Sequence, residues 1–251
     1  MVTVAEALNA GTQHHQAGRL AEAERIYRQI LAVEPHHPDA LHLLGMLAMQ
    51  AGQFAAAVEL IRQAIGIDGS QAAYYANLGE AYRHLGRFVD ATTCVRAAVA
   101  IDPTLGRSHS ALGNLLRLQG KHAEAQASLG EALRLIPQDV TTLVRLGQVL
   151  MDQGRSAEAE SYLQTAVRLE PDNSDAWFEL ATALQQQGRL DEAASGYQTA
   201  LQYNAGLIGA HINLGTIRTA QNSPALAAAH YRAALQIDGS SAAAHHNLGA
   251  V

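Results

Sequence analysis

The chain has 251 residues, of which 48% are hydrophobic and 16% charged, and its formal net charge is −6. This apolar content excludes a disordered chain, and no apolar run approaches the roughly 18 residues that a membrane-spanning helix needs. The acidic balance argues against a nucleic-acid-binding protein, which needs a positive surface. The single cysteine, Cys94, excludes a disulfide framework and a cysteine-based zinc site. Since its start does not resemble a signal sequence, we expect a cytoplasmic protein that binds neither nucleic acid nor membrane.

A period of 34 residues runs through the whole sequence without a change of register. One position of the period holds glycine or alanine: Gly11, Gly45, Gly79, Gly113, Gly147, Ala181, Gly215 and Gly249. A second position holds only alanine: Ala23, Ala57, Ala91, Ala125, Ala159, Ala193 and Ala227. A third position holds only leucine: Leu44, Leu78, Leu112, Leu146, Leu180, Leu214 and Leu248. We therefore expect one domain of seven repeats and the start of an eighth: residues 4–37, 38–71, 72–105, 106–139, 140–173, 174–207, 208–241 and 242–251.

Each repeat is predicted to form two helices joined by a turn. The spacing of Leu41, Leu44 and Ala48 is helical rather than alternating, and small residues are expected where two helix backbones approach closely. The turn holds a residue that tolerates positive φ and so ends the first helix: Gly18, Gly52, Gly86, Gly120, Gly154, Gly188 and Asn222. Prolines follow the second helix and stop it: Pro35, Pro103, Pro137 and Pro171.

Repeat six shows the pattern most completely, in residues Trp177, Leu180, Ala181, Leu184, Gly188, Ala193, Tyr197, Ala200 and Leu201. This pattern resembles the tetratricopeptide repeat, a helix-turn-helix unit of 34 residues. The resemblance covers essentially the whole chain. It implies an all-α, right-handed superhelical solenoid in which first helices line a concave face and second helices form the convex face.

The sequence stops at Val251, within the first helix of the eighth repeat, where Leu248 is expected to face a partner helix. Solenoids normally finish with a polar capping element. We therefore favour the interpretation that the chain is the N-terminal portion of a longer protein. Two alternatives are a last helix that frays and an open end that docks on another copy of the chain.

No motif in the sequence predicts catalysis, a metal site or a cofactor. The chain contains neither a Gly-x-Ser-x-Gly nor a phosphate-binding glycine loop nor a His-Glu-x-x-His motif. Neighbouring histidines on a helix point about 100° apart and do not chelate through one face. His109, His211 and His245 share a repeat position that is expected to pack, half-buried, against a neighbouring helix. We expect neither an enzyme nor a bound metal or cofactor.

The first helices carry a row of asparagines, which we predict to line the concave groove: Asn9, Asn77, Asn213 and Asn247. An amide offers both a donor and an acceptor, so it can pair with the backbone of any extended peptide. Asn-Leu-Gly recurs at 77–79, 213–215 and 247–249, which is similar to the repeats of O-linked N-acetylglucosamine transferases. That resemblance implies an inner surface that holds substrate polypeptide, although Leu43, Ala111, Arg145 and Glu179 interrupt the row. Alternatively, the asparagines are simply solvated.

Further side chains are predicted to lie in the same groove: Arg83, Arg107, Asn114, Arg117 and Arg145 in repeats three to five, and Leu43, Met46 and Met49 in repeat two. Methionine adapts to irregular apolar partners, and arginine binds carboxylates. A segment with an apolar anchor followed by acidic residues would suit this surface. The alternative is that the arginines pair with Glu80 and Asp152 and serve solubility.

Three hypotheses on function follow from these patterns. The leading one is a scaffold that binds a protein or peptide segment in its groove. The second is the substrate-recruiting arm of a protein glycosyltransferase whose catalytic domain lies beyond Val251. The third is a structural protein that associates end to end with copies of itself.

Overall fold

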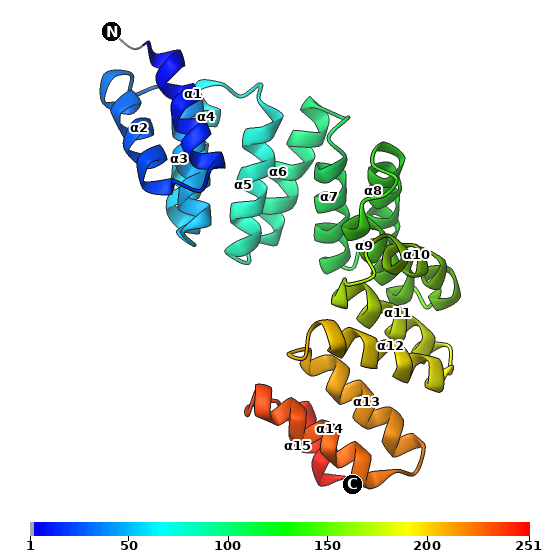
Figure 1. Cartoon of the computed structure of the whole chain (residues 1–251). Helices are drawn as coiled ribbons and strands as arrows, with labels where there is room; N and C mark the ends of the chain where they lie inside the picture. The colour runs from blue at the N-terminus through cyan, green and yellow to red at the C-terminus, as the bar shows by residue number, and fades with distance from the viewer. Residues whose placement is uncertain (1–2) are drawn as a thin grey trace. The chain divides into compact units, whose positions relative to one another are not determined.

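The computed structural model describes residues 3–251, which form fifteen α-helices and no strand (Figure 1). In chain order the helices are α1 (Val4–Gln16), α2 (Leu20–Val33), α3 (Pro38–Gln50), α4 (Phe54–Ile67), α5 (Ala72–His84), α6 (Phe88–Ile101), α7 (Gly106–Leu118), α8 (His122–Leu135), α9 (Val140–Asp152), α10 (Ser156–Leu169), α11 (Ser174–Gln186), α12 (Leu190–Tyr203), α13 (Ile208–Ala220), α14 (Pro224–Ile237) and α15 (Ala242–Gly249). The predicted all-α, helix-turn-helix repeat fold is confirmed.

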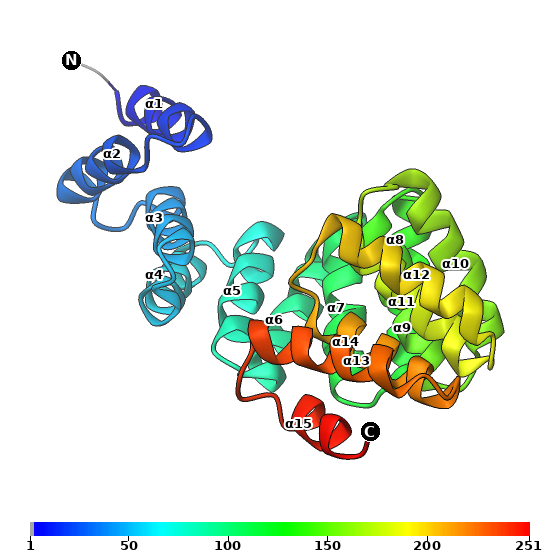
Figure 2. The same cartoon turned by 60° about the horizontal axis from the view of Figure 1, so that its bottom comes forward.

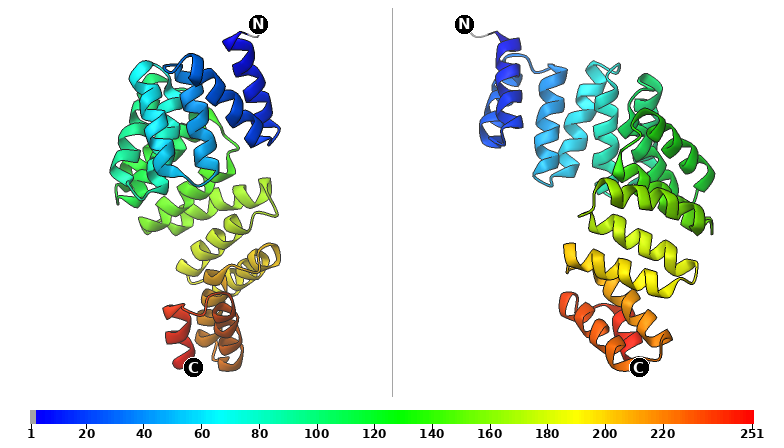
Figure 3. Two further views of the ribbon diagram at one scale, coloured as in Figure 1. Left: turned by 90° about the vertical axis from the view of Figure 1, so that its left-hand side faces the viewer. Right: turned by 45° about the vertical axis from the view of Figure 1, so that its right-hand side comes forward.

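The helices fall into two compact units, Met1–Leu135 with α1 to α8 and Ile136–Val251 with α9 to α15. In the first unit each odd-numbered helix packs on the even-numbered helix that follows it, as in the pairs α1–α2 and α3–α4 (Figure 2). In the second unit α9 to α14 form three such pairs, and α15 packs on α14 (Figure 3). The single-domain organisation stays a prediction.

The turn inside each pair has the conformation that its sequence requires. The six turn glycines have φ between 71° and 78°, and Asn222 has φ 56°. At the end of α1, the N–H of Gly18 donates to the carbonyl of His15 at 3.0 Å. Asparagine is one of the few residues with a Cβ that adopts this left-handed conformation at low cost. The predicted turn chemistry is therefore confirmed at all seven turns.

Close approach between the two helices of a pair explains the glycine position. A Cβ on Gly79 would lie 2.5 Å from Val95 Cγ2, and one on Gly113 would lie 2.5 Å from Leu129 Cγ. In repeat six, where Ala181 replaces this glycine, the small residue has moved to the opposite helix. A Cβ on Gly196 of α12 would lie 2.9 Å from the Cβ of Ala181.

Within each unit the odd-numbered helices, which we call the first helices, also contact one another. Such contacts join α3 to α5 in the first unit, and α9 to α11 and α13 to α15 in the second. The second helices contribute the alanine position, where all seven side chains are 0% exposed. The candidate site is built from side chains of these first helices.

Candidate functional site

All ten predicted site residues lie on first helices: Asn9, Met46, Met49, Asn77, Arg83, Asn114, Arg117, Arg145, Asn213 and Asn247. Asn9 is exposed, and the other nine are half-buried. A half-buried side chain can meet a ligand while its stem is held in place by the protein. Their assignment to a binding site stays a prediction.

In the first unit, Asn77 belongs to a polar cluster that joins α3 to α5 and in which His42 and Tyr74 are buried. Its Nδ2 donates to His42 Nε2 at 2.8 Å, and the ring of Tyr74 stacks on the His42 ring with centroids 4.5 Å apart. The hydroxyl of Tyr74 donates to Asp39 Oδ1 at 2.5 Å. The cluster therefore fixes the amide group of Asn77 from the side of the preceding repeat.

The protonation state of His42 follows from this geometry. Burial lowers the pKa of His42 to about 4, against a smaller opposing effect of Asp39. At neutral pH the imidazole is therefore uncharged, and its Nε2 lone pair is free to accept the Asn77 amide hydrogen. Burial and the neighbouring Asp39 raise the pKa of Tyr74, which stays a hydrogen-bond donor.

Arg83, on the same helix as Asn77, is held by an acidic neighbour one turn away. Its Nη2 lies 2.6 Å from Glu80 Oε1, and His84 Nε2 lies 3.1 Å from the same oxygen. The Arg83 hydrogen bond is the main cause of the lowered pKa of Glu80. The His84 ring stacks on Phe54 of α4 with centroids 4.3 Å apart. The pairing of Arg83 with Glu80 that the sequence raised as an alternative is thus observed.

Asn213 in the second unit occupies the same repeat position as Asn77 but has a different partner. Its Nδ2 donates to the hydroxyl of Tyr197 at 2.9 Å. That hydroxyl donates to Gln185 Oε1 at 2.7 Å and lies 3.1 Å from Thr182 Oγ1. The Asn-Leu-Gly recurrence therefore marks two asparagines whose amide nitrogens both bond to the preceding repeat.

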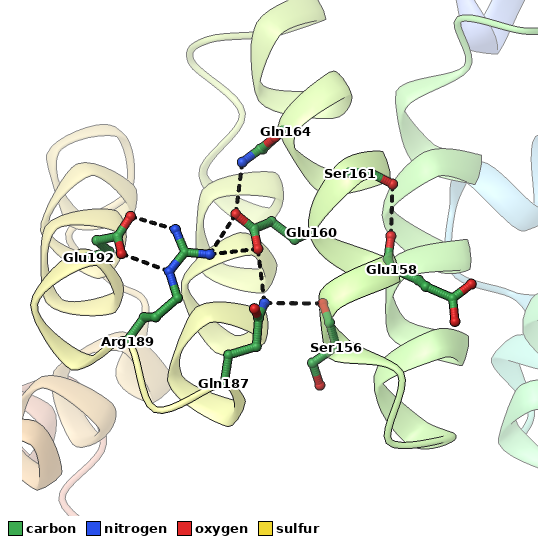
Figure 4. A network of polar contacts seen from close by, with 8 residues as sticks. All are labelled: Ser156, Glu158, Glu160, Ser161, Gln164, Gln187, Arg189 and Glu192. Carbon is green, nitrogen blue, oxygen red and sulfur yellow. Dashed lines mark hydrogen bonds and ion pairs between the residues drawn. The ribbon is translucent and has the colours of Figure 1, made fainter.

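A second polar network in this unit joins α10 to the turn between α11 and α12 and to the start of α12 (Figure 4). Arg189 bridges two carboxylates, with Nη1 2.7 Å from Glu160 Oε2 and Nη2 2.6 Å from Glu192 Oε2. Gln187 adds a bond from its Nε2 to the carbonyl of Ser156 at 3.3 Å. This network holds neighbouring repeats together and includes none of the predicted site residues.

The histidines at the shared repeat position have a structural role. His109 and His245 each place Nε2 within 3.0 Å of the backbone carbonyl six residues earlier, as Trp177 does with its indole N–H. His211 is half-buried as expected, and His109 is buried. The prediction is wrong for His245, which is exposed, because no second helix follows α15 among the described residues to cover it.

The single cysteine is half-buried among the described residues. No three His, Cys, Asp or Glu side chains among residues 3–251 gather in a way that could hold a metal ion. Burial raises the pKa of the Cys94 thiol to about 11, so it is protonated at neutral pH. No helix in this part of the chain is long and apolar enough to cross a membrane.

The sequence reasoning missed His42, Tyr74 and Tyr197, which fix the two asparagines. A signal for His42 was present, since a polar residue stands within the apolar run from Leu41 to Leu44. Tyr197 belongs to the pattern of repeat six, and that pattern predicts nothing about its hydroxyl group. That its hydroxyl reaches the next repeat depends on side-chain geometry, which periodicity does not describe.

The comparisons with known proteins agree with this fold. Residues 2–207 match the model of a tetratricopeptide-repeat family, described as the Cilia and flagella-associated protein 70 C-terminal domain. The chain belongs to this family. The comparison with curated protein sequences gives no match.

Solved structures share the fold at low sequence identity. The structure of the APC/C hetero-tetramer Cut9-Hcn1 is similar with a TM-score of 0.82 and 17% identity, over 96% of this chain and 47% of that one. A tetratricopeptide repeat protein from Parabacteroides merdae is similar with a TM-score of 0.76 and 16% identity, over 98% and 97% of the two chains. YrrB, described as a TPR protein with an unusual peptide-binding site, is similar with a TM-score of 0.57 and 24% identity, over 75% of this chain and 97% of that one. The chain thus spans about half the length of the Cut9-Hcn1 chain it matches. These likenesses show that the chain has the tetratricopeptide-repeat fold.

Proposed function

We propose that this protein is a scaffold that binds an extended polypeptide segment along its first helices. The observation that carries the proposal is the fixing of Asn77 and Asn213 by the preceding repeat. In both cases the amide nitrogen is used inside the protein, which leaves the carbonyl oxygen as an oriented acceptor for a backbone N–H of the ligand. Pre-orientation reduces the entropy that is lost when a ligand is bound.

The first unit is the better candidate for the main contact. Met46 and Met49 are half-buried on α3, so they offer an adaptable apolar surface on a helix that contacts α5, where Asn77 lies. Arg107 is exposed and Arg117 half-buried on α7. A peptide with an apolar anchor followed by acidic residues would suit this order of methionines and arginines. Arg83 contributes less to such a charge match, because Glu80 already neutralises it.

A structural relative supports binding of this kind. YrrB is described as having an unusual peptide-binding site, and its fold is shared by this chain. Recognition by a preformed groove is one of the recurring modes of peptide binding. The cytoplasmic location stays a prediction.

The test is a screen of the purified protein against an array of peptides that pair an apolar residue with acidic residues at varied spacing. We expect Asn77→Ala, Arg117→Ala and the double variant Met46→Ala/Met49→Ala each to weaken the best peptide by 5-fold or more, or about 1 kcal/mol. Arg62→Ala, on the second helix α4, is the matched control and should leave affinity unchanged. Peptides that bind all three variants as tightly as the parent protein would show that the first helices are not the binding surface.

A second proposal is the recruiting arm of an O-GlcNAc transferase-like protein glycosyltransferase. It is supported by the Asn-Leu-Gly recurrence alone, which places Asn77, Asn213 and Asn247 half-buried on first helices. Reading the gene beyond Val251 tests it, and a following stop codon or unrelated domain rejects it. End-to-end self-association is a further proposal, which light scattering over a concentration series tests, and a strict monomer at high concentration counts against it.

A further inference from the structure

A cavity of about 310 Å³ in the first unit is lined by residues of α2, α3 and α4 and of the turn between α3 and α4. Leu44 and Leu47 of α3 and Leu60 of α4 provide large apolar side chains to its lining. Glu24 and Arg28 of α2 provide charged ones. The cavity is separate from the predicted site residues, because none of those residues lines it.

The cavity exists because two lining positions hold alanine where the following repeats hold large side chains. Ala48 stands where repeat three has Tyr82 and repeat four has Leu116, which are 6% and 1% exposed. Leu47 and Leu60 are larger than Ala81 and Cys94 at the same positions of repeat three. The larger side chains of Leu47 and Leu60 do not fill the cavity.

Ala51 is the second small residue in the lining. Its counterpart in repeat four is Gln119, whose Nε2 donates to Thr92 Oγ1 at 2.6 Å and so reaches the second helix of the preceding repeat. Repeat two lacks this bridge, since an alanine cannot make it. Two missing side chains therefore leave an open space between α2 and the pair α3–α4.

The occupant of the equivalent space in repeat three indicates which chemistry fits. There the ring of Tyr82 is covered by the guanidinium of Arg87, 4.5 Å from the ring centroid. At the cavity Gln53 stands in the position of Arg87, and the cation in the lining is Arg28 of repeat one, whose Nη2 lies 2.8 Å from Glu24 Oε1. An aromatic ring is attracted to such a cation by its quadrupole, and Gln53 and Glu24 offer hydrogen-bond partners to a ring hydroxyl.

We propose that this cavity is a binding site for a phenol ring, either of a free small molecule or of a tyrosine side chain of a partner. The volume is sufficient, because an engineered apolar cavity of about 150 Å³ already binds benzene. It also falls at the lower end of the range of ligand pockets, about 300–1,000 Å³. The proposal does not rest on peptide binding along the first helices, since the two sites share no residue.

The test is an NMR titration of the full chain, with labelled leucine methyl groups, by 4-methylphenol. We expect saturable shifts of the Leu44, Leu47 and Leu60 methyl resonances, with a dissociation constant on the order of 1 mM, as is usual for so small a ligand. Ala48→Tyr should fill the cavity from inside and weaken binding at least tenfold. Ala55→Tyr, an exposed position on α4 that does not line the cavity, should leave binding unchanged.

A second filling variant, Ala51→Gln, keeps the test decisive if Ala48→Tyr does not fold. A parallel titration with N-acetyltyrosinamide separates the two sources of the ring: binding of 4-methylphenol alone indicates a free small molecule, whereas binding of both indicates a side chain. If the parent protein gives no saturable shift at these methyl groups, or if both folded filling variants bind as tightly as the parent, the proposal is overturned. Peptide binding along the first helices would be unaffected by either result.

Discussion

Tyr27 in repeat one and Tyr197 in repeat six occupy the same position of the second helix, and both are 0% exposed. Their hydroxyl groups nevertheless have different surroundings. The Tyr197 hydroxyl bonds to Gln185 and Asn213 and lies near Thr182. The Tyr27 hydroxyl forms no hydrogen bond of good geometry among the described residues, and only Thr12 lies close enough to oppose the burial that raises its pKa.

The difference arises from two neighbouring positions. Leu43 stands where repeat seven has Asn213, and His15 stands where repeat six has Gln185. Thr12 and its counterpart Thr182 both donate their hydroxyl to the carbonyl four residues earlier, so they do not cause the difference. A tyrosine buried at the same repeat position can therefore have a well or a poorly hydrogen-bonded hydroxyl group. Some of the residues that decide this belong to the next repeat.

The largest expected effect tests how each repeat makes room for its tyrosine. A Cβ on Gly11 would lie 2.6 Å from Tyr27 Cε1 and 3.2 Å from Ile26 Cγ2. Repeat six tolerates Ala181 at this position because Gly196 stands where repeat one has Ile26. Gly11→Ala should therefore destabilise the protein by roughly 3 kcal/mol through overpacking, measured by urea unfolding of the full chain.

The control for this prediction is Gly66→Ala, since a Cβ there would meet nothing within 4 Å. It should stabilise α4 slightly through helix propensity. A double-mutant cycle with Ile26→Ala sharpens the comparison, because trimming Ile26 should recover part of the loss. A Gly11→Ala protein as stable as the parent would show that α1 and α2 do not need a glycine at this position to pack closely.

The next effect concerns a buried polar group that, like Tyr197, has its partner in the next repeat. Burial lowers the pKa of His42 to about 4 in the folded protein, against about 6.5 when unfolded. Because the folded state favours the neutral form, the stability gained from this difference is complete above pH 6.5 and is lost as the pH falls toward 4. We expect a loss on the order of 2 kcal/mol across this window.

His42→Leu isolates this effect from the other titrating groups. The quantity to compare is the slope of unfolding free energy against pH for the parent and the variant between pH 6.5 and 4. The parent should have the steeper slope. Equal slopes would mean that the His42 ring titrates normally and is not fixed by Asn77.

These comparisons separate what the sequence could predict from what it could not. The 34-residue period predicted the helix pairs and the turn glycines, because backbone conformation depends on local residue types. The sequence shows that Ala181 departs from the glycine position. It does not predict that Gly196 makes room for Ala181, because that depends on which residues of the two helices come into contact. The partners of Asn77 and Asn213 were not predicted, because the same motif meets His42 in one place and Tyr197 in the other.

Removing the hydrogen-bonded hydroxyl of Tyr197 should have a moderate effect on the free energy of unfolding. In Tyr197→Phe the amides of Gln185 and Asn213 lose a buried partner, and such groups cost about 1–3 kcal/mol when left unsatisfied. We expect a loss of roughly 1.5 kcal/mol in unfolding free energy. Tyr203→Phe, an exposed tyrosine at the end of α12, is the matched control and should change stability by less than about 0.5 kcal/mol.

The smallest effect is expected at Tyr27, because its hydroxyl forms no hydrogen bond of good geometry. Tyr27→Phe removes a buried polar atom without a partner, so its unfolding free energy should stay within about 0.5 kcal/mol of the parent or rise. Leu43→Asn reverses this expectation, because it places an amide where Asn213 stands relative to Tyr197. In that background Tyr27→Phe should become destabilising, with a coupling energy of about 1 kcal/mol between the two positions. Additive effects in the double-mutant cycle would show that the neighbouring repeat does not control whether the tyrosine hydroxyl is satisfied.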